Sequence, residues 1–301
     1  MSLRARILRH VLRALARPQI ARTATPQDAR PRFLRAARLM FRPPPLSLIL
    51  PASGPVAGLW VQNQPRGDGV ILYLHGGAYV MGAPETHAAM LARLACLSGF
   101  PAFLPRYHLA PEHPFPAAFD DALAAWSRLL ALGYAPGQIV LGGDSAGGGL
   151  ALALLGHLCR IGQAPAGAFA FSPWTDLTFT GDSLRENAAR DPLLPAERVA
   201  EVRAMILGDP PATAPADPRL SPLFADFPGA PPVQIHVAET EILRDDSLRL
   251  QGPLPHADIR MAGDLPHVWP IFHNILPEAR STLAATADFI RACLAQSSAG
   301  S

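Results

Sequence analysis

The sequence has 301 residues, of which 49% are hydrophobic and 17% charged, and its formal net charge is +2. This length allows one large α/β domain with an insertion, or two domains. The small net charge argues against nucleic acid as the main partner. No apolar run reaches the roughly 18 residues needed to cross a bilayer, so we expect a soluble protein.

The first segment of the chain is strongly basic, and every basic residue in the sequence is an arginine. Residues 1–42 hold eleven arginines and one acid, Asp28, whereas the remainder holds 15 arginines and 23 acids. A basic amphipathic segment can lie on an anionic membrane. The simpler interpretation is a helical lid whose arginines face water. Arg13 and Arg17 interrupt the apolar stretch, which is untypical of a secretory signal.

The three cysteines, Cys96, Cys159 and Cys293, are far apart, and each lies in an apolar helical pattern. Their number and spacing favour neither a disulfide framework nor a metal site. We expect buried structural thiols in a reducing, cytoplasmic environment. The ten histidines show no metal-binding motif, so no metal is expected.

Further along, the prolines at residues 43–45 mark a boundary, after which strands and helices alternate. The predicted strands lie near residues 46–50, 56–62, 69–75, 101–105, 138–142, 167–171, 233–238 and 258–262. The predicted helices lie near residues 84–98, 115–132, 146–161, 195–207 and 277–296. This alternation indicates an open, mostly parallel sheet with helices on both faces. In such sheets, binding sites lie beyond the carboxyl ends of the strands.

A glycine-rich stretch directly after one predicted strand, Gly143-Asp144-Ser145-Ala146-Gly147, has the pattern G-x-S-x-G. A sharp strand-to-helix turn of this kind holds the serine in strained backbone angles and lifts its hydroxyl above the sheet. The following helix begins there, and its free N–H groups favour negative charge. We therefore predict Ser145 as a nucleophile.

A serine hydroxyl needs a base, and in sheets of this type the chain order is serine, acid, histidine. His256, His267 and His273 come late enough. His256 precedes the last strand and so belongs to the wrong edge, and His273 lies in an apolar run typical of the core. His267 lies in the loop after the last strand, which is the required place.

Four carboxylates follow the strand at 233–238: Glu239, Glu241, Asp245 and Asp246. The two aspartates fit the first turn of a following helix, where negative charge is favourable. Position alone favours Glu239 and Glu241 as the acid without choosing between them.

The loop His75-Gly76-Gly77-Ala78 follows the strand at 69–75. In acyl transfer the carbonyl oxygen becomes negative, and N–H groups already aimed at it lower the barrier. We predict Gly76, Gly77 and Ala146 as these oxyanion donors, because glycine leaves the backbone open to substrate. His75 is interpreted as a residue that holds the loop by hydrogen bonds.

Together these segments resemble the hormone-sensitive-lipase-like branch of the α/β-hydrolases, the HGGG-type bacterial carboxylesterases. The matching segments span residues 73 to about 272 and read YLHGGAYVMGAPETH, YHLAPEHPFPAAFDDALAAW, GGDSAGGGLAL, FSPWTDLT, ETEILRDDS and DLPHVWPIF. The resemblance implies an α/β-hydrolase fold with an eight-stranded, mostly parallel sheet. It assigns the nucleophile to Ser145, the base to His267 and the acid to Glu241.

The sequence departs from the family pattern at three positions: Ala78 in place of the third glycine, glutamate as the acid, and His108 where arginine is common. The resemblance also implies a helical cap made from residues 1–42 and an insertion at about 177–222, with residues 43–301 forming the hydrolase domain. Trp174, Phe179 and Trp269 are expected to line the substrate pocket.

The predicted function is hydrolysis of short-chain acyl esters through an acyl-enzyme, with no cofactor. A small ester is the expected partner. Two alternatives stay open, namely an amide or peptide hydrolase on the same triad and a non-catalytic ligand-binding homologue. Relatives often pair through the last strand and helix, so a homodimer is also open.

Overall fold

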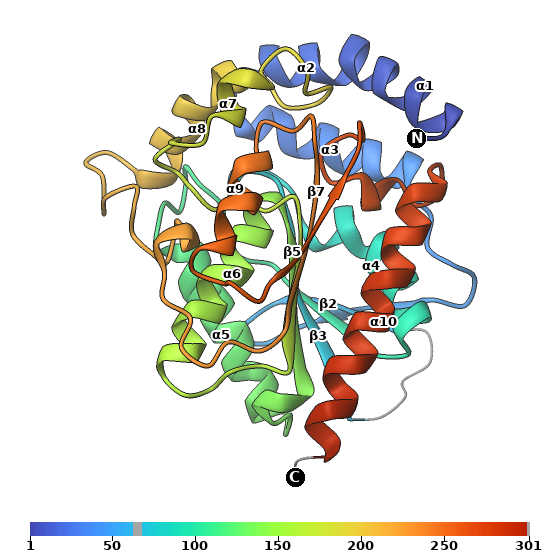
Figure 1. The fold of residues 1–301 in the computed structure, drawn as a ribbon, viewed down its shortest axis with the longest axis vertical. Coiled ribbons are helices and arrows are strands. Elements are labelled where there is room, and N and C mark those ends of the chain that lie inside the picture. The colour runs from blue at the N-terminus through green and yellow to red at the C-terminus, as the bar shows by residue number, and fades with distance from the viewer. Residues whose placement is uncertain (63–67, 300–301) are drawn as a thin grey trace.

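The computed structural model describes residues 1–62 and 68–299 and is built around one eight-stranded sheet, in the order β1-β2-β4-β3-β5-β6-β7-β8 (Figure 1). The strands are β1 (Leu48–Ala52), β2 (Gly58–Gln62), β3 (Val70–Leu74), β4 (Ala102–Pro105), β5 (Ile139–Asp144), β6 (Gly167–Phe171), β7 (Val233–Ala238) and β8 (Asp258–Ala262). The β1–β2 and β2–β4 pairs are antiparallel, and the other pairs are parallel. The predicted fold class is confirmed.

Two apolar cores lie on opposite faces of this sheet, because alternate side chains of each strand point to opposite sides. Val70, Leu72 and Leu74 of β3 join one core, and Ile71 and Tyr73 join the other. The first core includes α5 (Ala117–Ala131) and α6 (Ser145–Arg160), and the second includes α4 (Pro84–Ser98) and α10 (Pro277–Ala299). The continuous burial of β3 is typical of a central parallel strand.

The predicted strands and long helices are all present, with ends that differ by a few residues. The helix expected at 195–207 begins as a 3₁₀ turn, Ala196–Arg198, and continues as α8 (Val199–Leu207). One short helix, α7 (Ser183–Glu186), was not predicted, whereas α9 (Arg244–Leu248) is the helix expected to hold Asp245 and Asp246 in its first turn, although its bounds were not predicted. Helices this short carry too little periodicity to be read from sequence.

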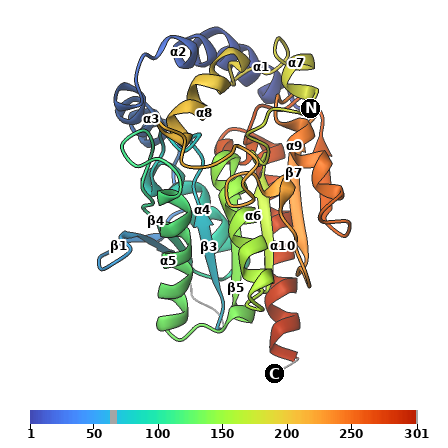
Figure 2. The same ribbon diagram turned by 90° about the vertical axis from the view of Figure 1, so that its left-hand side faces the viewer.

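The basic N-terminal segment forms α1 (Leu3–Val11), a π-helical stretch (Leu12–Ala16), α2 (Arg17–Arg22) and α3 (Pro26–Met40). In Figure 2, α1 and α2 lie beyond one end of the sheet, together with α7 and α8 of the segment between β6 and β7. Arg13 Nη2 donates to the carbonyl oxygen of Ala189 at 2.6 Å, and Arg198 Nη1 donates to that of Ala21 at 2.7 Å. The two segments expected to form a cap therefore bind each other.

No helix among residues 1–62 and 68–299 is long and apolar enough to span a membrane. One expectation for the thiols is wrong: Cys96 is exposed on α4, whereas Cys159 and Cys293 are buried. The helix carrying Cys96 is so alanine- and leucine-rich that its apolar pattern does not separate its inner and outer faces.

Candidate active site

Ser145 follows β5 directly and is the first residue of α6. Its φ angle is +51°, in the left-handed region that non-glycine residues rarely occupy. Only a small neighbour fits this turn, because a Cβ atom on Gly147 would lie 2.2 Å from the carbonyl oxygen of Leu74 and 2.3 Å from that of His75. The strained strand-to-helix turn predicted from G-x-S-x-G is present.

His267 and Glu241 form a buried pair on the loops after β8 and β7. Nδ1 of His267 donates to Oε2 of Glu241 at 2.6 Å. The other carboxylate oxygen, Oε1, accepts the Ala238 N–H at 2.7 Å and the Ser172 hydroxyl at 2.8 Å. Both carboxylate oxygens thus have fixed donors, and the imidazole is held in one orientation and one tautomer.

Charge around His267 favours its protonated form. Burial by itself would lower the pKa of His267, but the charge and hydrogen bond of Glu241, aided by Asp191 and Asp144, outweigh burial and raise that pKa above its usual 6.5. A carboxylate that raises the basicity of an imidazole suits a proton acceptor.

Ser145 and His267 are not joined by a hydrogen bond in the described part of the chain, where Nε2 of His267 is buried and without a partner. The loop after β6 contacts both the serine turn and the loop that carries His267. The Trp174 N–H donates to the Ser145 carbonyl oxygen at 2.9 Å, and Ser172 Oγ accepts the Val268 N–H at 3.2 Å. Nucleophile–base hydrogen bonds often tighten only in the substrate complex.

The glycine loop differs from the expectation at its first glycine. The Gly76 N–H donates to Oδ1 of the buried Asp144 at 3.0 Å, so it is already engaged. The N–H groups of Gly77, Ala78 and Ala146 have no partner among the residues described. Gly77 is required by its φ of +126° and by the Met81 carbonyl oxygen, 2.1 Å from where its Cβ would lie.

Asp144 organises the surroundings of that loop. Its carboxylate also accepts the Tyr73 hydroxyl at 2.8 Å and lies 3.2 Å from Nε2 of His87. Burial by itself would raise the pKa of Asp144, but His87 and these hydrogen bonds lower it. The aspartate inside G-x-S-x-G therefore fixes the glycine loop against the serine turn, a role the sequence analysis missed.

His75 has the structural role expected of it. Its ring stacks on Tyr107 with centroids 4.2 Å apart, and Nδ1 donates to the Gly76 carbonyl oxygen at 2.9 Å. Burial and the nearby His87 lower the pKa of His75 to about 3, so the ring is neutral.

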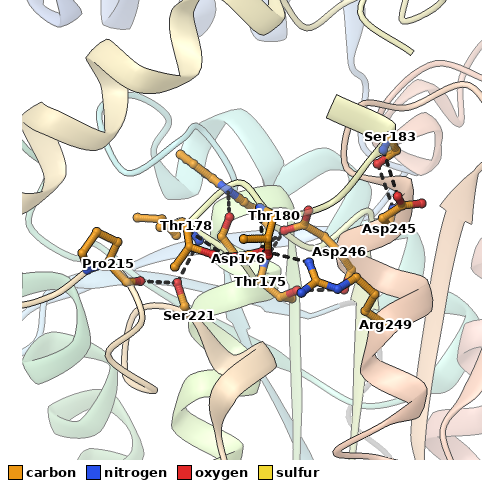
Figure 3. A network of polar contacts seen from close by, with 12 residues as sticks. Thr175, Asp176, Thr178, Thr180, Ser183, Pro215, Ser221, Asp245, Asp246 and Arg249 are labelled. Carbon is orange, nitrogen blue, oxygen red and sulfur yellow. Dashed lines mark hydrogen bonds and ion pairs between the residues drawn. The ribbon is translucent and has the colours of Figure 1, made fainter. Parts of the chain in front are cut away.

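The other three candidate acids, Glu239, Asp245 and Asp246, have partners other than His267. Glu239 is half exposed and lies 3.6 Å from Arg190. Asp245 and Asp246 lie in α9, as expected. Oδ2 of Asp246 accepts the N–H groups of Thr175 at 2.7 Å and Asp176 at 2.8 Å (Figure 3).

Figure 3 shows that the Asp246 carboxylate belongs to a larger polar network. In this network Arg249 Nη1 donates to Asp176 Oδ2 at 2.8 Å. Burial raises the pKa of Asp246 to about 7 against the opposing effect of the two backbone N–H groups. The network ties the loop after β6 to α9, the helix that begins three residues beyond Glu241.

Two functional neighbours had no clear sequence signal. Ser172, with φ +49°, bridges Glu241 and the His267 loop. Asp191, from the segment between β6 and β7, is buried, and its Oδ2 accepts the Ile242 N–H at 3.0 Å. Burial raises the pKa of Asp191. Both depend on contacts between segments far apart in the chain.

Aromatic side chains cluster around Trp174, whose backbone N–H donates to the Ser145 carbonyl oxygen. The Trp174 ring stacks on that of Phe179 with centroids 6.0 Å apart, and the centroid of the Tyr79 ring lies 6.5 Å from that of Trp174. Trp269 was wrongly expected here. Its indole N–H donates to Thr282 Oγ1 at 3.0 Å, within the core that α10 covers, because the chain turns inward after His267.

His273 and His108, which the sequence analysis also considered, have contacts away from Ser145. His273 is buried near the carbonyl oxygen of Arg42, and His108 pairs with Asp121 at 2.7 Å. Among the residues described, no group of histidine, cysteine, aspartate and glutamate could hold a metal ion.

Comparison with known proteins identifies the family and supports the fold. A family model with the alpha/beta hydrolase fold matches residues 71–267. An acetyl-hydrolase of Streptomyces hygroscopicus is 37% identical over 237 residues, covering 77% of this chain and 78% of that protein. An esterase of Acinetobacter venetianus is 34% identical over 285 residues, covering 93% of each chain.

Two solved structures superpose over nearly the whole chain. One is an esterase from the bacterial hormone-sensitive lipase family, with 37% identity, a TM-score of 0.90 and coverage of 98% of this chain and 99% of that one. The other is EstE5 soaked with p-nitrophenyl butyrate, with 34% identity, a TM-score of 0.90 and coverage of 98% and 100%.

Proposed function

The chain belongs to the α/β-hydrolase fold family, among the esterases of the bacterial hormone-sensitive lipase type, and from that premise we propose that it is a serine carboxylesterase with a Ser145–His267–Glu241 triad. Its proposed substrates are short-chain acyl esters. The observation that carries the proposal is the buried His267–Glu241 pair. Nε2 of His267 has no partner among the described residues, and both His267 and the strained Ser145 follow the carboxyl ends of strands of the same sheet.

In the first half of the reaction, Ser145 Oγ attacks the ester carbonyl carbon while Nε2 of His267 takes the hydroxyl proton. Glu241 stabilises the imidazolium that forms. The carbonyl oxygen becomes negative and is bound by the N–H groups of Gly77 and Ala146, with the free Ala78 N–H beside them. The carbon–oxygen bond to the alcohol breaks, and His267 gives its proton to the departing alkoxide.

In the second half, water attacks the acyl-serine and His267 takes a proton from that water. The second tetrahedral intermediate collapses, the carboxylic acid leaves, and Ser145 recovers its proton from His267. Gly76 is left out of the donor set, because its N–H holds Asp144 and thereby fixes the loop.

The proposed short-chain preference rests on the aromatic cluster of Trp174, Phe179 and Tyr79, which is joined to the serine turn through the Trp174 N–H and the Ser145 carbonyl oxygen. The structural relative EstE5 was soaked with a butyrate ester, which is consistent with a small acyl group. A panel of p-nitrophenyl esters of increasing acyl length tests this preference. A maximum of kcat/KM with long-chain esters would contradict it.

The catalytic proposal is tested by Ser145→Ala in hydrolysis of p-nitrophenyl acetate and butyrate. We expect turnover to fall by about 10⁶-fold, to background. Ser127→Ala is the matched control, since its exposed hydroxyl contacts only the Leu123 carbonyl oxygen. Retained turnover in Ser145→Ala would assign another nucleophile. Faster cleavage of a matched amide than of the ester by the parent protein would favour an amide hydrolase instead.

A further inference from the structure

The first helix of the chain has two apolar faces, and only one of them is covered. Ala5, Leu8 and Leu12 are buried against the rest of the molecule. The other side is apolar as well, but it faces solvent: the exposed fractions are 71% for Leu3, 56% for Ile7, 46% for Val11 and 68% for Leu15.

These four residues form a single stripe. Each follows the previous one by four residues, about one helical turn, so their side chains line up along the same side of the helix. The stripe runs the length of α1 and continues into the π-helical stretch Leu12–Ala16. We call Leu3, Ile7, Val11 and Leu15 the outer stripe.

The arginines of the segment divide in the same way. Arg9, Arg17 and Arg30 turn inward and form ion pairs with Asp264, Glu197 and Glu112. Arg4, Arg6 and Arg13 are exposed beside the outer stripe, and none of them has a carboxylate partner within the described residues. Arg13 also donates to the carbonyl oxygens of Ala189 and Arg190, and Arg4 donates to that of Ile275, but no described carboxylate neutralises the charge of these outward arginines.

The outer stripe is also placed where a flat surface can reach it. Figures 1 and 2 show α1 and α2 along one extremity of the molecule, at the opposite end from the C-terminus of α10. An exposed apolar stripe with uncompensated arginines at its border is the pattern of a helix that lies in a membrane interface.

We propose that the outer stripe docks on the surface of an anionic phospholipid bilayer. Leu3, Ile7, Val11 and Leu15 would enter the acyl boundary while the flanking arginines bind lipid phosphates. Charge selects this partner over a second copy of the chain. Arg4, Arg6 and Arg13 are exposed on this face without a carboxylate partner among the described residues, so two copies meeting through it would bring like charges together.

The test is cosedimentation of the full chain with vesicles of equimolar phosphatidylglycerol and phosphatidylcholine, beside vesicles of phosphatidylcholine alone. We expect binding to the anionic vesicles only. It should weaken at least tenfold between about 0.01 M and about 1 M salt, where the Debye length falls from about 30 Å to about 3 Å. Equal binding to both vesicles, or insensitivity to salt, overturns the proposal.

Two variants, each with a matched control, test whether the outer stripe and its flanking arginines bind the vesicles. Ile7→Ser/Leu15→Ser should weaken partitioning at least tenfold, whereas Leu132→Ser/Ile161→Ser, at comparably exposed positions of 55% and 50%, should not. Arg6→Gln should weaken it about fivefold, the equivalent of ~1 kcal/mol per arginine at an anionic surface, and Arg160→Gln should not.

Melting temperatures close to that of the parent show that each variant is folded. Sedimentation equilibrium without lipid tests whether the outer stripe instead joins two copies of the chain. A concentration-dependent dimer that Ile7→Ser/Leu15→Ser dissociates would overturn the proposal and make the outer stripe a subunit interface.

Discussion

Replacing Glu241 by glutamine tests the proposed acid through the tautomer of His267. Oε1 of Glu241 accepts the Ala238 N–H, a group that can only donate. In Glu241→Gln the amide oxygen must therefore occupy the Oε1 position, and the amide NH₂ faces Nδ1 of His267. Nδ1 then has to accept, and the imidazole proton moves to Nε2.

With its proton on Nε2, the nitrogen facing the nucleophile cannot take the proton of Ser145. A forced tautomer of this kind lowers kcat by about 10⁴-fold, equivalent to ~5.4 kcal/mol in the barrier. Glu239 provides the matched control. It is half exposed and pairs only with Arg190, so Glu239→Gln should change kcat by less than about twofold.

The assay is steady-state hydrolysis of p-nitrophenyl butyrate by the parent and both variants, with thermal unfolding of each to confirm an intact fold. A kcat for Glu241→Gln within about tenfold of the parent, at an unchanged Tm, would falsify the tautomer argument. A larger loss in Glu239→Gln than in Glu241→Gln would reassign the acid.

Three further predictions follow from the site and its supports. Since the base must be neutral and the pKa of His267 is raised above 6.5, kcat/KM should fall as pH drops through a value above 6.5; a lower midpoint in the parent contradicts this. The pKa of Asp246 rises from 3.8 to about 7 on folding, so the stability from its bound proton is present at low pH and lost as pH rises through about 7. Asp246→Asn should flatten the pH dependence of the free energy of unfolding between about pH 4 and about pH 7, and a slope equal to the parent's would refute this. Gly147→Ala forces Cβ to 2.2 Å from a carbonyl oxygen and should cost more than ~3 kcal/mol in urea unfolding. Gly263→Ala, which meets nothing within 4 Å, should be near neutral, and equal losses in the two variants would count against the packing argument.

The sheet and the serine turn were predictable because each is encoded locally. Short apolar runs bounded by turn residues, such as Val70–Leu74, are typical of buried strands, and the glycines around Ser145 indicate a turn too tight for larger residues. His267 was predictable from chain order, since it follows the last strand.

Other features depend on contacts that no local pattern reports. Chain position left Glu239 and Glu241 equivalent, and only the resemblance separated them. The structure places Glu241 in contact with His267 because the chain turns inward there, leaving Glu239 near the surface. The engagement of Gly76 by Asp144 likewise joins residues 68 positions apart, so the donor set could not be read from the glycines alone.

The hydrogen bonds between the N-terminal segment and the segment between β6 and β7 have a consequence for exchanging parts between relatives. Arg13 and Arg17 donate to backbone carbonyls of residues 188–190, and Arg198 donates back to those of residues 20–23. A chimera that imports only the segment between β6 and β7 would replace Arg198 and can shift the backbone carbonyls that Arg13 and Arg17 bind. We therefore expect that both stretches must be exchanged together for these hydrogen bonds to be kept.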